Sequence, residues 1–329
     1  MKRRDRIKKR REKHRTIKET PAKPSQEKTE QKTPEKKTGS FYERNYKQLL
    51  IIPFGLLVIA LILIGIQTAQ TGDFINKGIT LKGGTTITIL DEGLNHREIR
   101  GALQAEFPLQ EINTRRLEEA GRQAGITIEA SILPEDREQS ERLTELVKEI
   151  TGKEDEDLSV ETIGAALGDA FFRQTMVAVL IAFVFMGIVV FLYFKSFVPS
   201  AAVILAAFSN IVVTIAILNI AGITIGTAGI AALLMLIGYS VDTDILLSTR
   251  VLKRTQGTVY ERTIDAMKTG LTMTGTTLVA VFIAFLVAES QVLMEIMMII
   301  MIGLVIDLIN TWIQNAGILR YYLERKGER

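Results

Sequence analysis

The chain has 329 residues, 47% of them hydrophobic, a formal net charge of +3 and no cysteine. The lack of cysteine excludes disulfides and thiolate metal sites. His14 and His96 are the only histidines, and both lie outside the apolar blocks, which leaves almost nothing for a histidine-based zinc site or catalytic triad. We therefore expect no metal and no cofactor, and the long apolar blocks disfavour a soluble α/β protein.

Residues 1–40 are charged, contain proline and nearly lack large apolar side chains. Such a segment buries too little surface to fold, so we expect a disordered basic cytoplasmic arm. Two interpretations remain open for this arm. It contacts anionic lipid headgroups or ribosomal RNA, or it is a solvated tail that fixes the orientation of the chain.

Apolar blocks predict six membrane-spanning helices, because each is long enough to cross about 30 Å of hydrocarbon and a lipid-exposed backbone must bond to itself. The first block, at 48–66, follows a leader too long for a signal peptide and is interpreted as an uncleaved anchor. The remaining helices are assigned to 174–319, and residues 320–329 to a cytoplasmic tail. Their apolar blocks lie at 174–194, 198–219, 223–247, 271–288 and 291–313.

Residues 67–173 form the one sizeable soluble piece between the first and second spans. Alternating patterns predict strands at 79–90, 111–118, 125–131 and 158–163, and helical spacing predicts helices at 95–106 and 136–150. This β-α-β-β-α-β order suggests a ferredoxin-like α+β domain, with two helices on one side of a small antiparallel sheet.

The glycine pair Gly83-Gly84 interrupts the first predicted strand of this domain. It indicates a bulge or a close backbone approach. A phosphate-binding loop is the alternative, but no P-loop lysine or following helix supports it.

Charge asymmetry predicts the orientation of the chain. The arm at 1–40, the loop at 250–268 and the tail at 320–329 are basic, whereas the domain at 67–173 is acidic on balance. Positive charge remains in the cytoplasm. Both termini are therefore expected inside, and the α+β domain outside, the cell membrane.

Two carboxylates in the predicted spans, Asp242 and Asp307, are the leading functional candidates, because intramembrane acids are costly and are commonly functional. Asp244 is two residues from Asp242 and so points to another face. Arg250 closes the fourth span and, with Lys268, is a candidate counter-charge. A polar helix-packing face is expected from small and polar residues at helical spacing, namely Gly238, Thr272, Thr276, Gly303, Asn310 and Gln314.

A carboxylate buried in a membrane can load and release protons as access to it alternates. No base, hydroxyl nucleophile or metal cluster nearby suggests bond chemistry, so the chain is not expected to be an enzyme. An intramembrane aspartyl protease needs two carboxylates that share a proton. The sequence around Asp307 reads GLVID and lacks the usual Gly-x-Gly-Asp motif.

Four stretches together resemble the SecF family of the SecD–SecF protein-export auxiliary, and most closely its archaeal members. They are Gly78–Thr85 (GITLKGGT), Val160–Gly168 (VETIGAALG), Gly238–Arg250 (GYSVDTDILLSTR) and Lys268–Leu278 (KTGLTMTGTTL). The acid of bacterial members falls on Thr243, whereas Asp242 matches the Val-Asp motif of the partner protein. The resemblance covers nearly everything after residue 41.

The resemblance implies half of a fold shared with proton-driven RND exporters. It also implies pairing with SecD, contact with the Sec translocation channel and with secreted chains, and use of the proton gradient. Asp242 is then the first candidate for the coupling site and Asp307 the second. Two alternatives stay open: a self-sufficient RND-type transporter for small molecules or lipids, and a passive membrane scaffold.

Overall fold

A computed structural model describes residues 41–119, 122–254, 256–288 and 290–327. The basic arm expected at 1–40 lies outside these residues. Among the described residues, six helical stretches are long and apolar enough to cross a membrane, which confirms the predicted number of spans. They run over Asn45–Thr71, Ala165–Phe194, Phe197–Ile220, Thr227–Lys253, Val259–Val287 and Val292–Arg325.

The helices of these stretches differ in length from the apolar blocks. In chain order they are α2 (Phe41–Leu49) with α3 (Ile51–Thr71), α7 (Ala165–Phe194), α8 (Phe197–Ile220), α9 (Thr227–Lys253) and α10 (Val259–Val287), and finally α11 (Gln291–Ile309), the π-helical segment Asn310–Asn315 and α12 (Ala316–Arg325). Helix α7 begins inside the stretch that the sequence assigned to the soluble domain, because its first turns pack against the backbone of the sheet domain. At Gly168 the contact is so close that a Cβ would lie 2.6 Å from the backbone nitrogen of Gly83. Helix α12 continues to Arg325, where the Arg320–Glu324 pair, four residues apart, supports its last turn.

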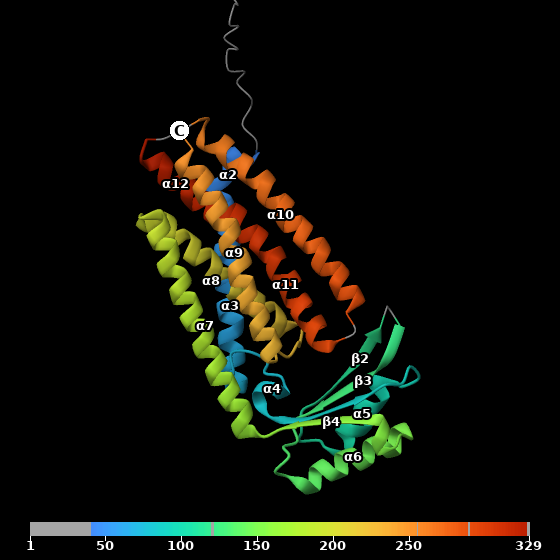
Figure 1. The fold of residues 1–329 in the computed structure, drawn as a ribbon. Helices are drawn as coiled ribbons and strands as arrows, with labels where there is room; N and C mark the ends of the chain where they lie inside the picture. Colours follow the sequence, from blue (N-terminus) through green and yellow to red (C-terminus); the bar gives the residue numbers. More distant parts are fainter. Residues whose placement is uncertain (1–40, 120–121, 255, 289, 328–329) are drawn as a thin grey trace, which may run out of the picture. The chain divides into compact units, whose positions relative to one another are not determined.

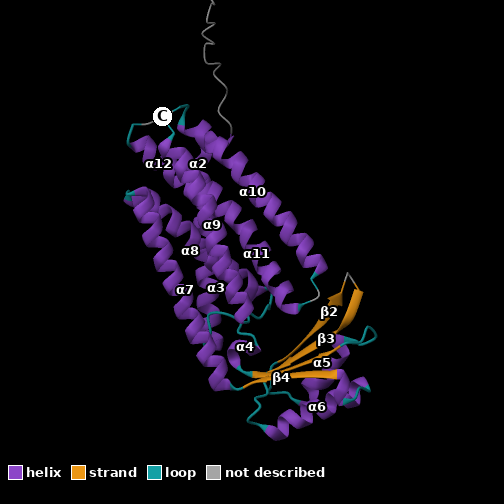
Figure 2. Ribbon diagram, in the orientation of Figure 1, coloured by secondary structure: helices purple, strands orange, loops and turns teal. Residues whose placement is uncertain are grey.

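A four-stranded antiparallel sheet lies between the first and second spans in the chain (Figure 2). Its strands are β1 (Gly84–Ile89), β2 (Ile112–Glu119), β3 (Arg122–Ala130) and β4 (Leu158–Ile163), in the order β2-β3-β1-β4. Helices α5 (His96–Glu106) and α6 (Arg137–Thr151) pack on one face of the sheet (Figure 1). This order confirms the ferredoxin-like domain, which we call the sheet domain.

Local sequence explains where the two sheet-domain helices begin. The side chain of Asn95 accepts a hydrogen bond from the Arg97 N–H, and that of Asp136 accepts one from the Gln139 N–H. Such caps satisfy donors that the first helical turn leaves free. Both helices then bury an apolar face, through Leu103 in α5 and through Leu143 and Val147 in α6.

The first predicted strand is wrong over its first four residues. Ile79–Lys82 form a short helical turn, α4, rather than a strand. Gly83 ends this turn at φ +83°, a conformation that favours glycine. A Cβ on Gly84 would lie 2.5 Å from the carbonyl oxygen of Ala130, so the glycine pair marks the close backbone approach that the sequence indicates.

The sheet domain is attached to the bundle through residues 73–80 and the loop between α8 and α9. The Gly78 N–H donates to the Ile225 carbonyl at 2.9 Å, and the Ile225 N–H donates to the Asn76 carbonyl at 2.7 Å. The Asn219 side chain accepts from the Asn76 N–H at 3.1 Å and donates to the Phe74 carbonyl at 3.0 Å. These bonds fix the base of the domain to the ends of α8 and α9.

Candidate functional site: a buried carboxylate pair

Helix α9 turns a row of small and polar side chains toward α11. Ser240, Asp244 and Ser248 follow one another at intervals of four residues, and all three are fully buried. Side chains four apart in a helix lie on one face. Because α9 and α11 make an extensive contact, this row lies at the interface between the two helices.

The facing side chains come from α11 and from the π-helical segment that follows it. Asp307 is fully buried near the end of α11, and Thr311, Gln314 and Asn315 are fully buried in the next turn. A π-helical segment widens the helix by one residue per turn and is frequent at functional sites. Here it brings side chains of several consecutive positions into one interior.

Asp307 accepts three hydrogen bonds at its Oδ1 atom. Ser240 Oγ donates from α9, Asn210 Nδ2 donates from α8 at 3.4 Å, and Thr311 Oγ1 donates from the π-helical segment at 3.3 Å. The carboxylate therefore joins three of the spanning stretches.

Asp244 is held from the same segment. Asn315 Nδ2 donates to Asp244 Oδ1 at 2.8 Å. We call Asn210, Ser240, Asp244, Asp307, Thr311 and Asn315 the polar cluster.

Several oxygens of the polar cluster are buried without a hydrogen-bond donor. They include Oδ2 of both aspartates and Oδ1 of Asn210 and Asn315, among the residues that the structure describes. Within the same residues, no lysine or arginine forms a salt bridge with either aspartate. A buried carboxylate without a positive partner is costly.

The expected counter-charges lie elsewhere. Arg250 Nη1 donates to the carbonyl of Asp265 at 3.0 Å, between α9 and α10. Lys268 lines a shallow groove on the outside of α10 together with Thr272 and Thr276, which are exposed. The hydroxyls of these two threonines bond to carbonyls of their own helix, those of Lys268 and Met273.

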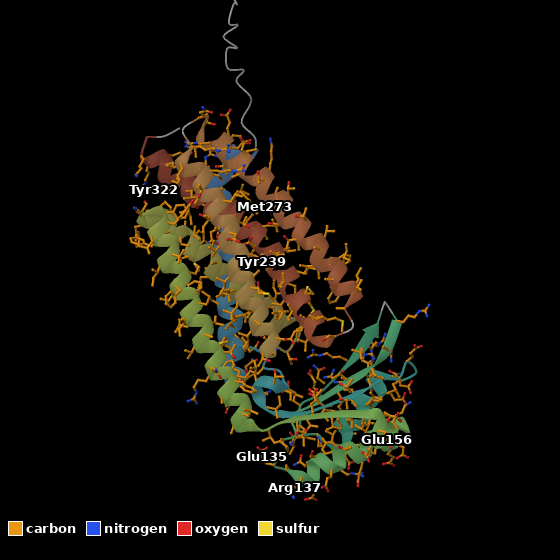
Figure 3. All side chains as sticks on the ribbon, in the orientation of Figure 1. Glu135, Arg137, Glu156, Tyr239, Met273 and Tyr322 are labelled. Atoms are coloured by element: carbon orange, nitrogen blue, oxygen red, sulfur yellow. The ribbon has the colours of Figure 1, made fainter. Side chains whose placement is uncertain are left out.

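Asp242, the first candidate from the sequence, lies on the opposite side of α9 from Asp244 and is exposed in this chain. Tyr239, which precedes it by three residues, is also exposed, and Figure 3 labels it together with Met273 of α10. The structure thus brings Asp307 together with Asp244 rather than with Asp242.

The expected packing face is likewise divided. Gly303 packs against Leu236, and Asn310 and Gln314 are buried, whereas Gly238 faces open space. Gly303, Asn310 and Gln314 thus lie on a buried face of the last spanning stretch, whereas Gly238, Thr272 and Thr276 point outward.

Ser240 and Asn315 were not predicted as site residues from the sequence. Each lies one helical turn from another member of the polar cluster, Ser240 from Asp244 and Asn315 from Thr311. Glu295 of α11 was missed altogether. Its Oε1 accepts a hydrogen bond from the Gly226 N–H at 2.7 Å, at the start of α9. Glycine at 226 and 229 leaves room for this carboxylate, since a Cβ on Gly229 would lie 2.4 Å from Oε1. Glu295 could have been found from the sequence, because it is a carboxylate within an apolar span.

The fold and the polar cluster together define a multi-pass membrane protein with an α+β domain inserted after its first span. The model of the family "Protein export membrane protein SecD/SecF, C-terminal" matches residues 142–325. The chain is 37% identical over 285 residues to protein-export membrane protein SecF of Methanolacinia petrolearia, covering 86% of this chain and 95% of that one. It is 39% identical over 286 residues to SecF of Methanocaldococcus jannaschii, covering 85% and 96%. This chain belongs to the SecF family.

Solved structures show the same fold. SecDF of Thermus thermophilus, a translocon-associated membrane protein, superimposes with a TM-score of 0.65 at 20% identity. The match covers 87% of this chain and 39% of the SecDF chain. SecDF in its super-membrane-facing form gives a TM-score of 0.52 at 19% identity. The chain therefore spans well under half the length of these solved proteins.

Proposed function

We propose that this chain assists protein export across the cell membrane as the partner of SecD, and that Asp244 and Asp307 couple export to the proton gradient. The observation that carries the coupling is the polar cluster. Two carboxylates from different helices share one buried, hydrogen-bonded interior, and among the described residues no cation compensates them. The pairing with SecD and the export role follow from membership of the family.

Charge buried in the polar cluster is unfavourable, and this links proton binding to the packing of the helices. An ionised carboxylate in a membrane interior costs at least about 3 kcal/mol, and two neighbouring ones also repel each other. Protonation removes both costs, and a shift of α9 against α11 that admits water lowers the cost of the charged form and so favours release of the proton. Proton binding and helix position are then linked, which is what a gradient-driven machine requires.

Asp242 supports the proposed partnership. A carboxylate on the outward face of a span is unfavourable against lipid. A second membrane subunit packed on this face of α9 would cover Asp242, together with the exposed Tyr239. We propose SecD as that subunit, with Asp242 as a further coupling candidate at the shared interface.

The remaining assignments belong to the same proposal. Both termini lie in the cytoplasm and the sheet domain lies outside, where it meets the emerging chain. The protein acts with the Sec channel and is not an enzyme. Residues 1–40 either contact anionic lipid or the ribosome or act as a solvated tail that fixes the orientation of the chain. The basic loop at 250–268 supports this orientation.

The test measures export of a secretory protein into membrane vesicles that contain this chain, SecD and the channel, with and without an imposed proton gradient. Asp307→Asn and Asp244→Asn preserve shape and remove the titratable group. Each is expected to reduce export under the gradient to the level seen without it. Asp265→Asn, the same change at an exposed carboxylate of α10, is the matched control and should leave the gradient effect intact.

Unchanged gradient-dependent export in both variants would contradict coupling through the polar cluster and favour a passive scaffold. Purification from the native membrane tests the partnership separately. Recovery of SecD and channel subunits supports it. A homodimer purified without them would favour a self-sufficient RND-type transporter.

A further inference from the structure

Residues of α2, α10 and α12 line a pocket of about 770 Å³. Figure 1 shows these three helices at the end of the bundle away from the sheet domain. Tyr322 of α12, labelled in Figure 3, marks the same end. Lys47, Arg320 and Arg325 line the pocket, with the rings of Tyr260 and Tyr321 between them. We call this the end pocket.

Positive charge exceeds negative charge in the end pocket. Glu324 is the single acid among its described lining residues. It is already engaged, because it accepts hydrogen bonds from Arg320 Nε at 3.0 Å and from the Tyr46 hydroxyl. Arg320 and Glu324 therefore neutralise each other.

Lys47 and Arg325 are the other two cations of the end pocket. Both are exposed, and neither forms a salt bridge within the part of the chain that the structure describes. Both approach the ring of Tyr321, with Lys47 Nζ 5.7 Å and Arg325 Cζ 4.8 Å from its centroid. The shared ring holds two unpaired cations on one wall of the pocket.

Helix α10 also starts at the pocket, after Thr258, but the carboxylate of Glu261 in its first turn accepts from the Thr258 N–H and offsets the positive end of the helix dipole. The two cations and the aromatic rings favour a compact anion with several acceptor oxygens, which is the chemistry of a phosphate group.

An apolar track leads from the pocket along the first span. The helix is continuous from Tyr46 to Phe54, since the Leu50 N–H donates to the Tyr46 carbonyl and the Phe54 N–H to the Leu50 carbonyl. Ile51 lies one turn after Lys47 on the same side and is 71% exposed. Val58 and Ile62 continue this outward surface. An acyl chain can lie along it while a headgroup occupies the pocket.

We propose that the end pocket binds the phosphate of an anionic phospholipid, with Lys47 and Arg325 as its ligands and the apolar track as the surface for one acyl chain. Phosphate chemistry alone would also fit a soluble phosphate ester. The track on α3 favours the lipid. This site is separate from the polar cluster, so it stands whether or not Asp244 and Asp307 couple to protons.

The experiment measures binding of phosphatidylglycerol and phosphatidylcholine to the purified full-length chain in neutral detergent by native mass spectrometry. The variant Lys47→Gln/Arg325→Gln removes both proposed ligands at exposed positions. Lys326→Gln removes a neighbouring charge that does not line the pocket and is the matched control. Inorganic phosphate and glycerol phosphate serve as competitors.

We expect phosphatidylglycerol to bind more tightly than phosphatidylcholine to the wild-type chain. The double variant should weaken phosphatidylglycerol binding about tenfold or more, given the contribution of each lysine or arginine near an anionic surface. Lys326→Gln should change it less than twofold. Equal binding by the wild-type chain and the double variant, or equal affinity for the two lipids, would overturn the proposal. Competition by glycerol phosphate at the same concentration as the lipid would overturn the lipid assignment.

Discussion

At the scale of single residues, two positions decide what α9 can do. Asp242 and Asp244 have the same chemistry and differ by about 200° around the helix. One is exposed on the outward face, and the other is fully buried beside Asp307. That both residues are aspartates therefore does not show which of them is buried. Their different environments come from the neighbouring helices α8 and α11.

The same dependence on neighbours appears in the sheet domain at Asp91 and Lys153. Lys153 Nζ lies 2.8 Å from Asp91 Oδ2, and the Gly93 N–H donates to Asp91 Oδ1. The bond to Lys153, followed by that from Gly93, lowers the pKa of Asp91 below its ordinary value of 3.8. The bond to Asp91 in turn raises the pKa of Lys153 above 10.5.

This pair predicts a pH window for stability. Because folding lowers the pKa of Asp91, the pair stabilises the fold above pH 3.8, and this stabilisation is lost as the pH falls through the pKa that Asp91 has in the folded protein. Because folding raises the pKa of Lys153, the stabilisation is also lost as the pH rises through the folded pKa of Lys153. Asp91→Asn should therefore lower the thermal unfolding midpoint near neutral pH and converge with the wild type at both extremes. Thermal unfolding across pH checks this. Glu92→Gln, a change at the adjacent exposed carboxylate, should show no such window.

At the scale of elements, the close packing of α9 against α11 positions the polar cluster. Gly303 permits it, since a Cβ there would lie 2.2 Å from the buried Leu236 Cδ2. Two turns later, the amide side chains of the π-helical segment Asn310–Asn315 point inward. A regular α-helix would direct fewer of these side chains to one interior.

Gly303→Val is expected to force α9 and α11 apart. Overpacking a tight interface costs about 1–3 kcal/mol, so the thermal unfolding midpoint in detergent should fall. Gly238→Val provides the control, because nothing lies within 4 Å of a Cβ at that glycine. Equal midpoints for the two variants would show that the α9–α11 contact is not tight.

At the scale of the whole molecule, the attachment of the sheet domain links the outside of the protein to the ends of its spanning helices. Thr80 Oγ1 accepts from the Thr227 N–H at 3.1 Å, at the first residue of α9. Arg115 of β2 donates to Thr224 and pairs with Glu129 at 3.0 Å. Burial raises the pKa of Glu129 while Arg115 opposes that shift. Movement of the domain would therefore reach α9, which also carries Asp244.

Asn219→Ala is expected to loosen this attachment. It removes the two side-chain bonds to Asn76 and Phe74, worth about 1–3 kcal/mol together, so amide hydrogen exchange over residues 73–78 should accelerate by roughly tenfold. Asn113→Ala truncates an amide of the sheet domain whose side chain makes no hydrogen bond among the described residues, and should leave this exchange unchanged. Unaltered exchange in Asn219→Ala would mean that the backbone bonds to Ile225 suffice.

The number of spans, the ferredoxin-like order of the inserted domain and the family could all be predicted from the sequence alone. Each of these depends on local patterns: apolar length, alternation, caps at Asn95 and Asp136, and contiguous motifs such as Gly238–Arg250. These patterns are properties of neighbouring residues, so they need no knowledge of the packed structure.

Which carboxylate of α9 is buried depends instead on how the helices pack. The same packing brings Ser240 and Asn315 into the polar cluster and leaves Arg250 and Lys268 outside it. Helical spacing shows which residues share a face but not which neighbour that face meets. It also assumes a regular helix, which the π-helical segment violates. The turn at Ile79–Lys82 escaped detection for a related reason, because its alternating residues pack against α7 and α9 rather than continuing the sheet. Burial of charge is a property of the assembled helices, and it appears only once they are packed.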